Sequence, residues 1–95
     1  MFAKKENGAS APIDTLISSA TRIQGDVAFR GGLHLDGQVA GSVQAEAGVP
    51  SRLVVSSGAV VEGSVAADVV EVEGVVRGDI HAPARVILGP AARVE

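Results

Sequence analysis

The sequence predicts an all-β fold, a parallel β-solenoid of about four to five turns. A phrase of the form Val-x-Gly-[Asp/Ser]-Val, with Ile in place of Val at some positions, occurs four times, and its copies begin at Ile23, Val39, Val61 and Val76. Internal repeats are typical of chains in which each copy buries its apolar face against the next. The copies start 16, 22 and 15 residues apart, and Val94 follows Val76 by 18. Such steps suit one coil of three short strands, because a strand rises ~3.3 Å per residue.

The apolar residues are mostly small or β-branched, which favours stacked strands over a helix bundle. The 95 residues include 16 Val, 12 Gly and 2 Phe, with no Trp or Tyr. A compact globule of this length depends on larger side chains to bury enough area. Small β-branched side chains suit a narrow interior in which equivalent positions form columns. Each Gly inside a helix would cost roughly 0.5 to 1 kcal/mol relative to Ala, so helix is the poorer prediction.

Residues 1–18 combine charged, polar, Gly and Pro residues without a period. We therefore predict a disordered N-terminal tail over 1–18 and a β-helix domain over 19–95. From Ala20 onward apolar and polar residues alternate, as in a strand with one buried face. The first coil is expected to bury Ile23, Gly25, Val27 and Phe29. The second coil is expected to bury Leu33, Leu35, Gly37, Val39, Gly41, Val43 and Ala45.

The segment 46–52 contains Gly and Pro and accounts for the 22-residue step, so we predict a loop that leaves the stack at one corner. The third coil is then expected over 53–65 and the fourth over 70–80. Residues 86–95 align with 53–62, which predicts a fifth, incomplete coil. The sequence stops where its own pattern requires Gly and a β-branched residue, so we expect a truncated sequence rather than an open last coil.

Charge and composition argue against several classes of partner. The net charge is −3, and nucleic-acid binding needs a clustered positive field with aromatic platforms, so no nucleic acid is expected. The absence of Cys excludes disulfides and thiolate metal sites. No apolar run approaches the ~18 residues of a membrane-spanning helix. The start of the chain also lacks the apolar stretch of a secretory signal.

No catalytic, cofactor or metal site is predicted. His34 and His81 are the only histidines, both on the outward face of the alternation, and two are too few for a three-histidine zinc site. A hydrolytic triad is not expected, because no strand-to-helix elbow presents a serine nucleophile. Glu62, Glu71 and Glu73 alternate with inward valines and are expected to be solvated rather than to bind a cation.

The start of the chain is a candidate membrane-targeting segment, formed by Met1, Phe2, Lys4 and Lys5. The Phe ring can insert into an interface, and anionic headgroups attract each Lys with about 1 kcal/mol. One such tail would adsorb weakly and reversibly. Many tails along a polymer would hold an anionic membrane through effective concentration.

The ends of a short solenoid predict self-assembly. Its first and last coils leave unpaired backbone groups and a slice of apolar core. Neither end of the sequence supplies a convincing capping helix, so another copy of the same end is the simplest cover. If each end pairs with the same end of another copy, the two kinds of contact alternate along an unbranched filament that has no polarity. Such assembly needs no nucleotide. The candidate polymerisation residues lie in the terminal coils: Ile23, Val27, Phe29, Val86, Leu88 and Val94.

The repeated Val-x-Gly-[Asp/Ser]-[Val/Ile] phrases, the turns between them and the start Met-Phe-x-Lys closely resemble bactofilins, bacterial polymer-forming cytoskeletal proteins. The resemblance covers about residues 14–95 and touches 1–5. It implies a right-handed, single-stranded parallel β-helix of triangular section that forms non-polar filaments spontaneously. It also implies that Met1, Phe2, Lys4 and Lys5 attach the protein to the cytoplasmic face of the inner membrane. Cell-wall synthesis or hydrolysis enzymes that determine cell shape are the partners it implies.

Two other functions stay open. A hexapeptide acyltransferase of the left-handed β-helix class needs an aliphatic residue at fixed six-residue spacing, usually before Gly. Here the spacings within a coil are 4 or 5, and the residues before Gly include Gln24, Asp36, Glu62 and Arg77. A monomeric adaptor would bind a partner through the 46–52 loop or the outer acidic strip, and a sample that stays monomeric when dilute would favour it.

Overall fold

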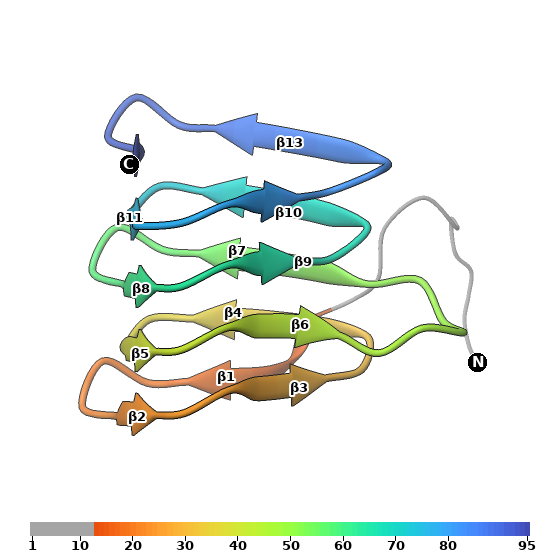
Figure 1. Ribbon diagram of the computed structural model, residues 1–95, viewed down its shortest axis with the longest axis horizontal. Coiled ribbons are helices and arrows are strands. Elements are labelled where there is room, and N and C mark those ends of the chain that lie inside the picture. Colours follow the sequence, from red (N-terminus) through yellow and green to blue (C-terminus); the bar gives the residue numbers. More distant parts are fainter. Residues whose placement is uncertain (1–12) are drawn as a thin grey trace.

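The structure is a column of five coils in which each strand pairs in parallel with the equivalent strands of neighbouring coils (Figure 1). The computed structural model describes residues 13–95, which form strands and no helix. Sheet A contains β1 (Ile13–Ile17), β4 (Gly32–Leu35), β7 (Arg52–Val55), β10 (Val69–Val72) and β13 (Arg85–Leu88). Sheet B contains β2 (Arg22–Gln24), β5 (Gln38–Ala40), β8 (Val60–Glu62), β11 (Val75–Val76) and β14 (Arg93–Val94). Sheet C contains β3 (Val27–Phe29), β6 (Val43–Ala45), β9 (Val65–Ala66) and β12 (Ile80–His81). The predicted parallel solenoid is confirmed.

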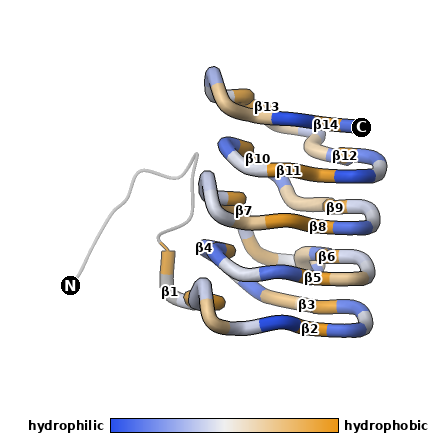
Figure 2. Tube along the Cα trace, turned by 90° about the vertical axis from the view of Figure 1, so that its left-hand side faces the viewer, coloured by the Kyte–Doolittle hydropathy of each residue, from blue (hydrophilic) through white to orange (hydrophobic). Residues whose placement is uncertain are grey.

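The repeated phrase of the sequence sets the register of the stack. Val39 pairs with Val61, Val61 with Val76, and Val76 with Val94, so equivalent residues of successive copies lie over one another. The alternation of hydrophobic and hydrophilic residues can be followed along the coils in Figure 2. The largest fully buried side chains are Leu33, Leu35, Val39, Val43, Leu53, Val55, Val61, Val65, Val70, Val72 and Val76. Each contributes about 1.5 to 3 kcal/mol through burial, which explains why these columns are apolar.

The stack begins earlier than the sequence predicted. Strand β1 lies within the predicted disordered tail, yet it pairs with β4 along sheet A. The boundary expected at residue 19 is therefore wrong, and the β-helix includes residues from Ile13 onward. The alternation is hidden because Thr15 lies opposite Leu33, in a column that is apolar in every other coil. An end coil faces the core from one side only, so a polar residue is tolerated there. Residues 1–12 of the predicted tail lie outside the described residues.

The corner between sheets A and B changes width from coil to coil. Four residues form it in the first, third and fifth coils (18–21, 56–59 and 89–92), and two form it in the second and fourth (36–37 and 73–74). A backbone hydrogen bond closes each wide corner, from the N–H of its last residue to the C=O of its first. Narrow and wide corners therefore alternate along the column, a two-coil repeat that the sequence analysis did not predict.

Glycine is required where sheets B and C meet. A Cβ on Gly63 would overlap the carbonyl group of Gly41, and a Cβ on Gly78 would overlap that of Gly63. The backbones of successive coils approach so closely here that no side chain fits. This contact explains why the second, third and fourth copies of the phrase keep Gly at the third position, at Gly41, Gly63 and Gly78.

The predicted insertion is confirmed as a loop over 46–51, which joins β6 to β7 and projects beyond the other corners (Figure 1). Arg52, which the sequence analysis included in the loop, is the first residue of β7. Strands β4 and β7 still pair directly, so the insertion leaves the stack intact.

Candidate assembly surfaces

The fifth coil leaves apolar side chains of the core columns exposed. Val86, Leu88 and Val94 are 45, 56 and 44 % exposed. Each lies over a fully buried valine of the fourth coil, so these side chains continue the core columns. Within residues 13–95 no further strand lies over them. Within the described residues this end is therefore an apolar surface bordered by sheet edges with free backbone groups, which either a further coil or another protein could cover.

The first coil covers its end of the core better. Ile17, Ile23 and Val27 are half-buried and pack against the core, and Phe29 is only 7 % exposed. Phe29 lies opposite Ala45 in sheet C, and the small Ala side chain leaves room for the ring. The two ends of the column therefore differ in how much apolar surface they present.

The six predicted polymerisation residues fall into three groups. The three in the fifth coil are accessible to a second molecule, whereas Ile23 and Val27 are accessible only in part. Phe29 belongs to the buried core and presents little surface for a contact. Their role in assembly stays a prediction. Alternation indicates which face of a strand a side chain occupies, and it does not indicate what covers that face in an end coil.

The predicted membrane-targeting residues Met1, Phe2, Lys4 and Lys5 lie outside the described residues, so their role stays a prediction. The described chain starts at Ile13 in β1, so the segment that carries them joins the column at sheet A of the first coil. No helix in residues 13–95 is long and apolar enough to cross a membrane.

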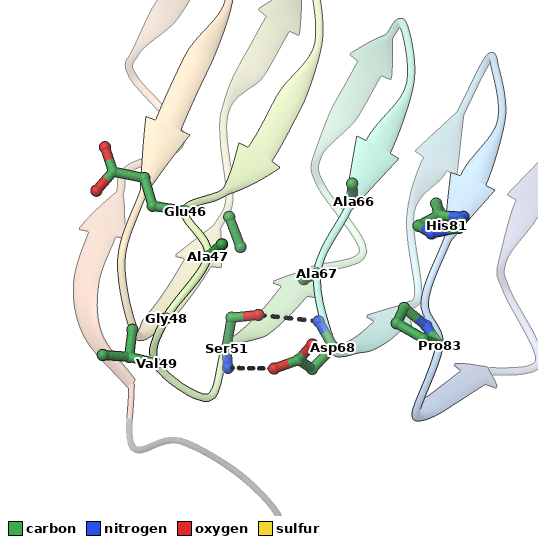
Figure 3. A pocket seen from close by; sticks show the side chains of 11 residues that line it. Glu46, Ala47, Gly48, Val49, Ser51, Ala66, Ala67, Asp68, His81 and Pro83 are labelled. Carbon is green, nitrogen blue, oxygen red and sulfur yellow. Dashed lines mark hydrogen bonds between the residues drawn. The ribbon is translucent and has the colours of Figure 1, made fainter.

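The 46–51 loop borders a surface cavity of about 290 Å³. Figure 3 shows the loop on one side, His81 and Pro83 on the other, and Ala66 and Ala67 between them. Ala66 lies between Gln44 and His81 in its sheet column, so a small residue separates two larger ones. The cavity arises because two Ala side chains lie beside a projecting loop.

Reciprocal hydrogen bonds fix the base of this loop. The Ser51 N–H donates to Asp68 Oδ2 at 3.2 Å, and the Asp68 N–H donates to Ser51 Oγ at 2.9 Å (Figure 3). Ser51 is buried, so these bonds satisfy polar groups that would otherwise be costly. At the other end of the loop, Glu46 pairs with Arg30 at 3.2 Å. The loop is therefore held at both ends.

Two of the acidic side chains considered as cation ligands pair with arginines instead. Glu71 lies 2.6 Å from Arg52 in a half-buried pair, and Glu62 lies 3.0 Å from Arg77 in an exposed one. Among residues 13–95, no group of three or more His, Asp or Glu side chains could hold a metal ion.

The two histidines lie on different faces of the column. His34 is half-buried in β4 of sheet A, and His81 is exposed in β12 of sheet C. Ser56 donates a hydrogen bond to Asp36 at the corner between sheets A and B. This bond links a wide corner to the narrow corner of the preceding coil, which is a structural role.

The sequence of the column matches a known protein family. The model of the bactofilin family, described as polymer-forming cytoskeletal, matches residues 15–95. The chain belongs to the bactofilin family. No curated protein and no solved structure gave a match. The matched residues run from β1 to the end of the fifth coil, so the assignment covers nearly all of the described column.

As a bactofilin, the chain is a polymer-forming cytoskeletal protein, and this description implies self-association. The description of the family names a cytoskeletal role and no catalytic activity. It gives no support to the acyltransferase alternative. A polymer needs contacts between copies, and Val86, Leu88 and Val94 of the fifth coil are exposed apolar residues that continue the core columns.

Proposed function

We propose that this bactofilin assembles end to end, without nucleotide, into unbranched filaments. The observation that carries the proposal is the apolar end of the fifth coil, where Val86, Leu88 and Val94 continue the core columns but are exposed. Contact with a second molecule would remove these side chains from water, at about 25 cal/mol for each Å² of apolar surface buried. It would also bring sheet edges together and pair their free backbone groups.

The difference between the two ends supports pairing of like with like. A two-fold contact presents the same patch from both molecules, so an apolar end is best covered by another apolar end. The end at the first coil, with Thr15 in a core column and Phe29 buried, would form a second contact of its own. Alternation of the two contacts yields a filament without polarity.

We further infer that the filaments lie on the cytoplasmic face of the bacterial inner membrane and recruit cell-wall synthesis or hydrolysis enzymes there. The support for membrane attachment is the chemistry of the start of the chain, with Phe2 beside Lys4 and Lys5. A single tail binds weakly, and a filament that carries many tails binds through effective concentration. The support for enzyme recruitment is the resemblance to bactofilins.

The test of end-to-end assembly uses two neighbouring residues of β13. Leu88 continues a core column, whereas Ile87 pairs with Glu71 on the outer face of sheet A. Leu88→Glu should abolish fibres in negative-stain microscopy of nucleotide-free protein, because it buries a charge in the contact. Ile87→Glu adds the same charge in the same coil and should leave the fibres intact. Circular dichroism checks that both variants keep their β signal, and fibres of the folded Leu88→Glu variant would contradict the proposal.

A monomeric adaptor is the second candidate, and the cavity beside the 46–51 loop is the observation that favours it. Its loop is fixed by the Ser51 and Asp68 hydrogen bonds, as a preformed binding site would need. Analytical ultracentrifugation at physiological salt separates the two functions. Concentration-dependent assembly supports the filament, and a monomer at every concentration supports the adaptor.

A further inference from the structure

We propose that sheet A is the side of the column that lies against an anionic membrane surface. The inference rests on the proposed membrane attachment and adds to it which face of the filament contacts lipid. Three observations carry it: where exposed apolar side chains lie, what the other two faces present, and where the chain enters the column.

The exposed apolar side chains outside the fifth-coil end gather on one side. Leu16 in β1 and Ile87 in β13 are 64 and 41 % exposed. Ile13, also in β1, and Val49, in the loop that leads into β7, are exposed as well. Apart from the three core-column residues of the fifth coil, these four are the exposed large hydrophobic residues of the described chain. All of them therefore belong to sheet A or to the corner before it.

Leu16 and Ile87 occupy one outward column of sheet A. Leu16 lies opposite His34, which alternates with buried leucines, so the column points away from the core. The column continues in order through Leu16, His34, Val54, Glu71 and Ile87. Its one carboxylate is paired with Arg52, which limits repulsion from anionic headgroups. Arg85 is exposed in the same strand as Ile87 and adds a positive charge to this face.

The other two faces are less suited to lipid. The outward residues of sheet C are small or polar: Ala28, Gln44, Ala66 and His81. The outward residues of sheet B are mainly polar or charged, with two half-buried valines: Arg22, Gln24, Gln38, Ala40, Val60, Glu62, Val75 and Arg93. An interfacial surface combines exposed apolar side chains with cations, and only sheet A offers this combination among the described residues.

The chain enters the column on the same side. Strand β1 is the first described strand and belongs to sheet A, so residues 1–12, with Phe2, Lys4 and Lys5, connect there. Twelve residues span at most about 40 Å when fully extended, so tails bound to lipid hold the column close to the membrane, and the exposed residues of sheet A then determine which face turns toward it. Each subunit of a filament would repeat the contact, so that small contributions add up.

Single-cysteine labelling tests the orientation, because the chain contains no Cys. The environment-sensitive dye NBD is attached at Ile87→Cys in sheet A, and at Val75→Cys in sheet B and Ala66→Cys in sheet C as matched controls. Vesicles of phosphatidylglycerol and phosphatidylethanolamine are added to the full chain, and sedimentation of the same samples measures binding. We expect a blue shift and at least a roughly twofold rise in emission at position 87 only, because that dye leaves water.

Every other outcome contradicts the proposal that sheet A faces the membrane, and the combination of label signal and sedimentation shows which part of the proposal fails. Protein that pellets with vesicles while the label at 87 stays unchanged is held by the tail alone, so membrane attachment stands and the orientation falls. A shift at 75 or 66 instead of 87 assigns another face. A shift at 87 that needs only more protein, without vesicles, shows that a second copy covers sheet A. Protein that does not pellet refutes membrane attachment itself, and the orientation with it.

A second pair of variants measures how much the face contributes. The double variant Leu16→Ser, Ile87→Ser should weaken vesicle binding several-fold, because it removes apolar surface from the interface. The matched double variant Val60→Ser, Val75→Ser on sheet B should leave binding unchanged. Circular dichroism confirms that both are folded, and equal vesicle affinities of the two double variants would overturn the proposal.

Discussion

The two ends of the column differ in strand pattern and in surface, because the first coil has a strand in each sheet (β1, β2 and β3) and the fifth coil, as described, has β13 and β14 but none in sheet C. At the fifth coil, Val86, Leu88 and Val94 continue the core columns and are about half exposed. At the first coil, Phe29 is buried and Thr15 replaces an apolar residue in a core column. The fifth-coil end therefore exposes side chains of the core columns to solvent. The first-coil end covers part of the core with residues of its own coil. The repeat determines which residues stack in the core columns. The residues specific to each end coil determine how much of the core is exposed at that end.

The largest expected effect is a loss of folding stability. It is measured by truncating one apolar side chain at each end of the column. Phe29→Ala should lower the free energy of unfolding by about 3 kcal/mol, because it removes a buried ring and leaves a cavity. Leu88→Ala should lower it by less than about 1 kcal/mol in unassembled protein, because that side chain is already half exposed. Urea unfolding followed by circular dichroism at low concentration measures both. Equal losses would show that the two ends do not differ in burial.

A smaller effect is expected from the glycines at the corner between sheets B and C. Gly63→Ala should destabilise the fold by about 2 kcal/mol, because the new Cβ overlaps the carbonyl of Gly41 and forces the coils apart. Gly25→Ala in the first coil should cost about 1 kcal/mol, from its φ of +131° alone, since no atom lies within 4 Å of its Cβ position. Thermal unfolding of the pair gives the comparison. A Gly25→Ala variant that is the less stable of the two would contradict the proposed stacking contact.

The sequence was sufficient to predict which residues stack between coils and where the long loop leaves the column, because both follow from the repeat. The spacing of the four phrases predicted that Val39, Val61, Val76 and Val94 stack in one column, and the long step predicted the 46–51 loop. Both predictions follow from period-two alternation combined with internal repetition.

The features that were not predicted depend on contacts between coils, which the periodicity of the sequence does not reveal. Strand β1 was missed because Thr15 breaks the alternation in a coil that has a neighbour on one side only. The burial of Phe29 depends on the small Ala45 opposite it. The alternating corner widths were missed because each narrow corner fits against the wide corners of neighbouring coils. In each case the deciding interaction lies between coils rather than along one strand.

Crosslinking at the fifth coil tests the central claim most directly. Leu88→Cys places a single thiol at the apolar end, and Ile87→Cys places one beside it on the outer face. A short bis-maleimide should join two Leu88→Cys chains into a dimer, and the Ile87→Cys protein should remain uncrosslinked, because like ends meet across a two-fold contact. If Leu88→Cys crosslinks only when mixed with Ile23→Cys protein, opposite ends meet, and the account of like-with-like assembly is contradicted.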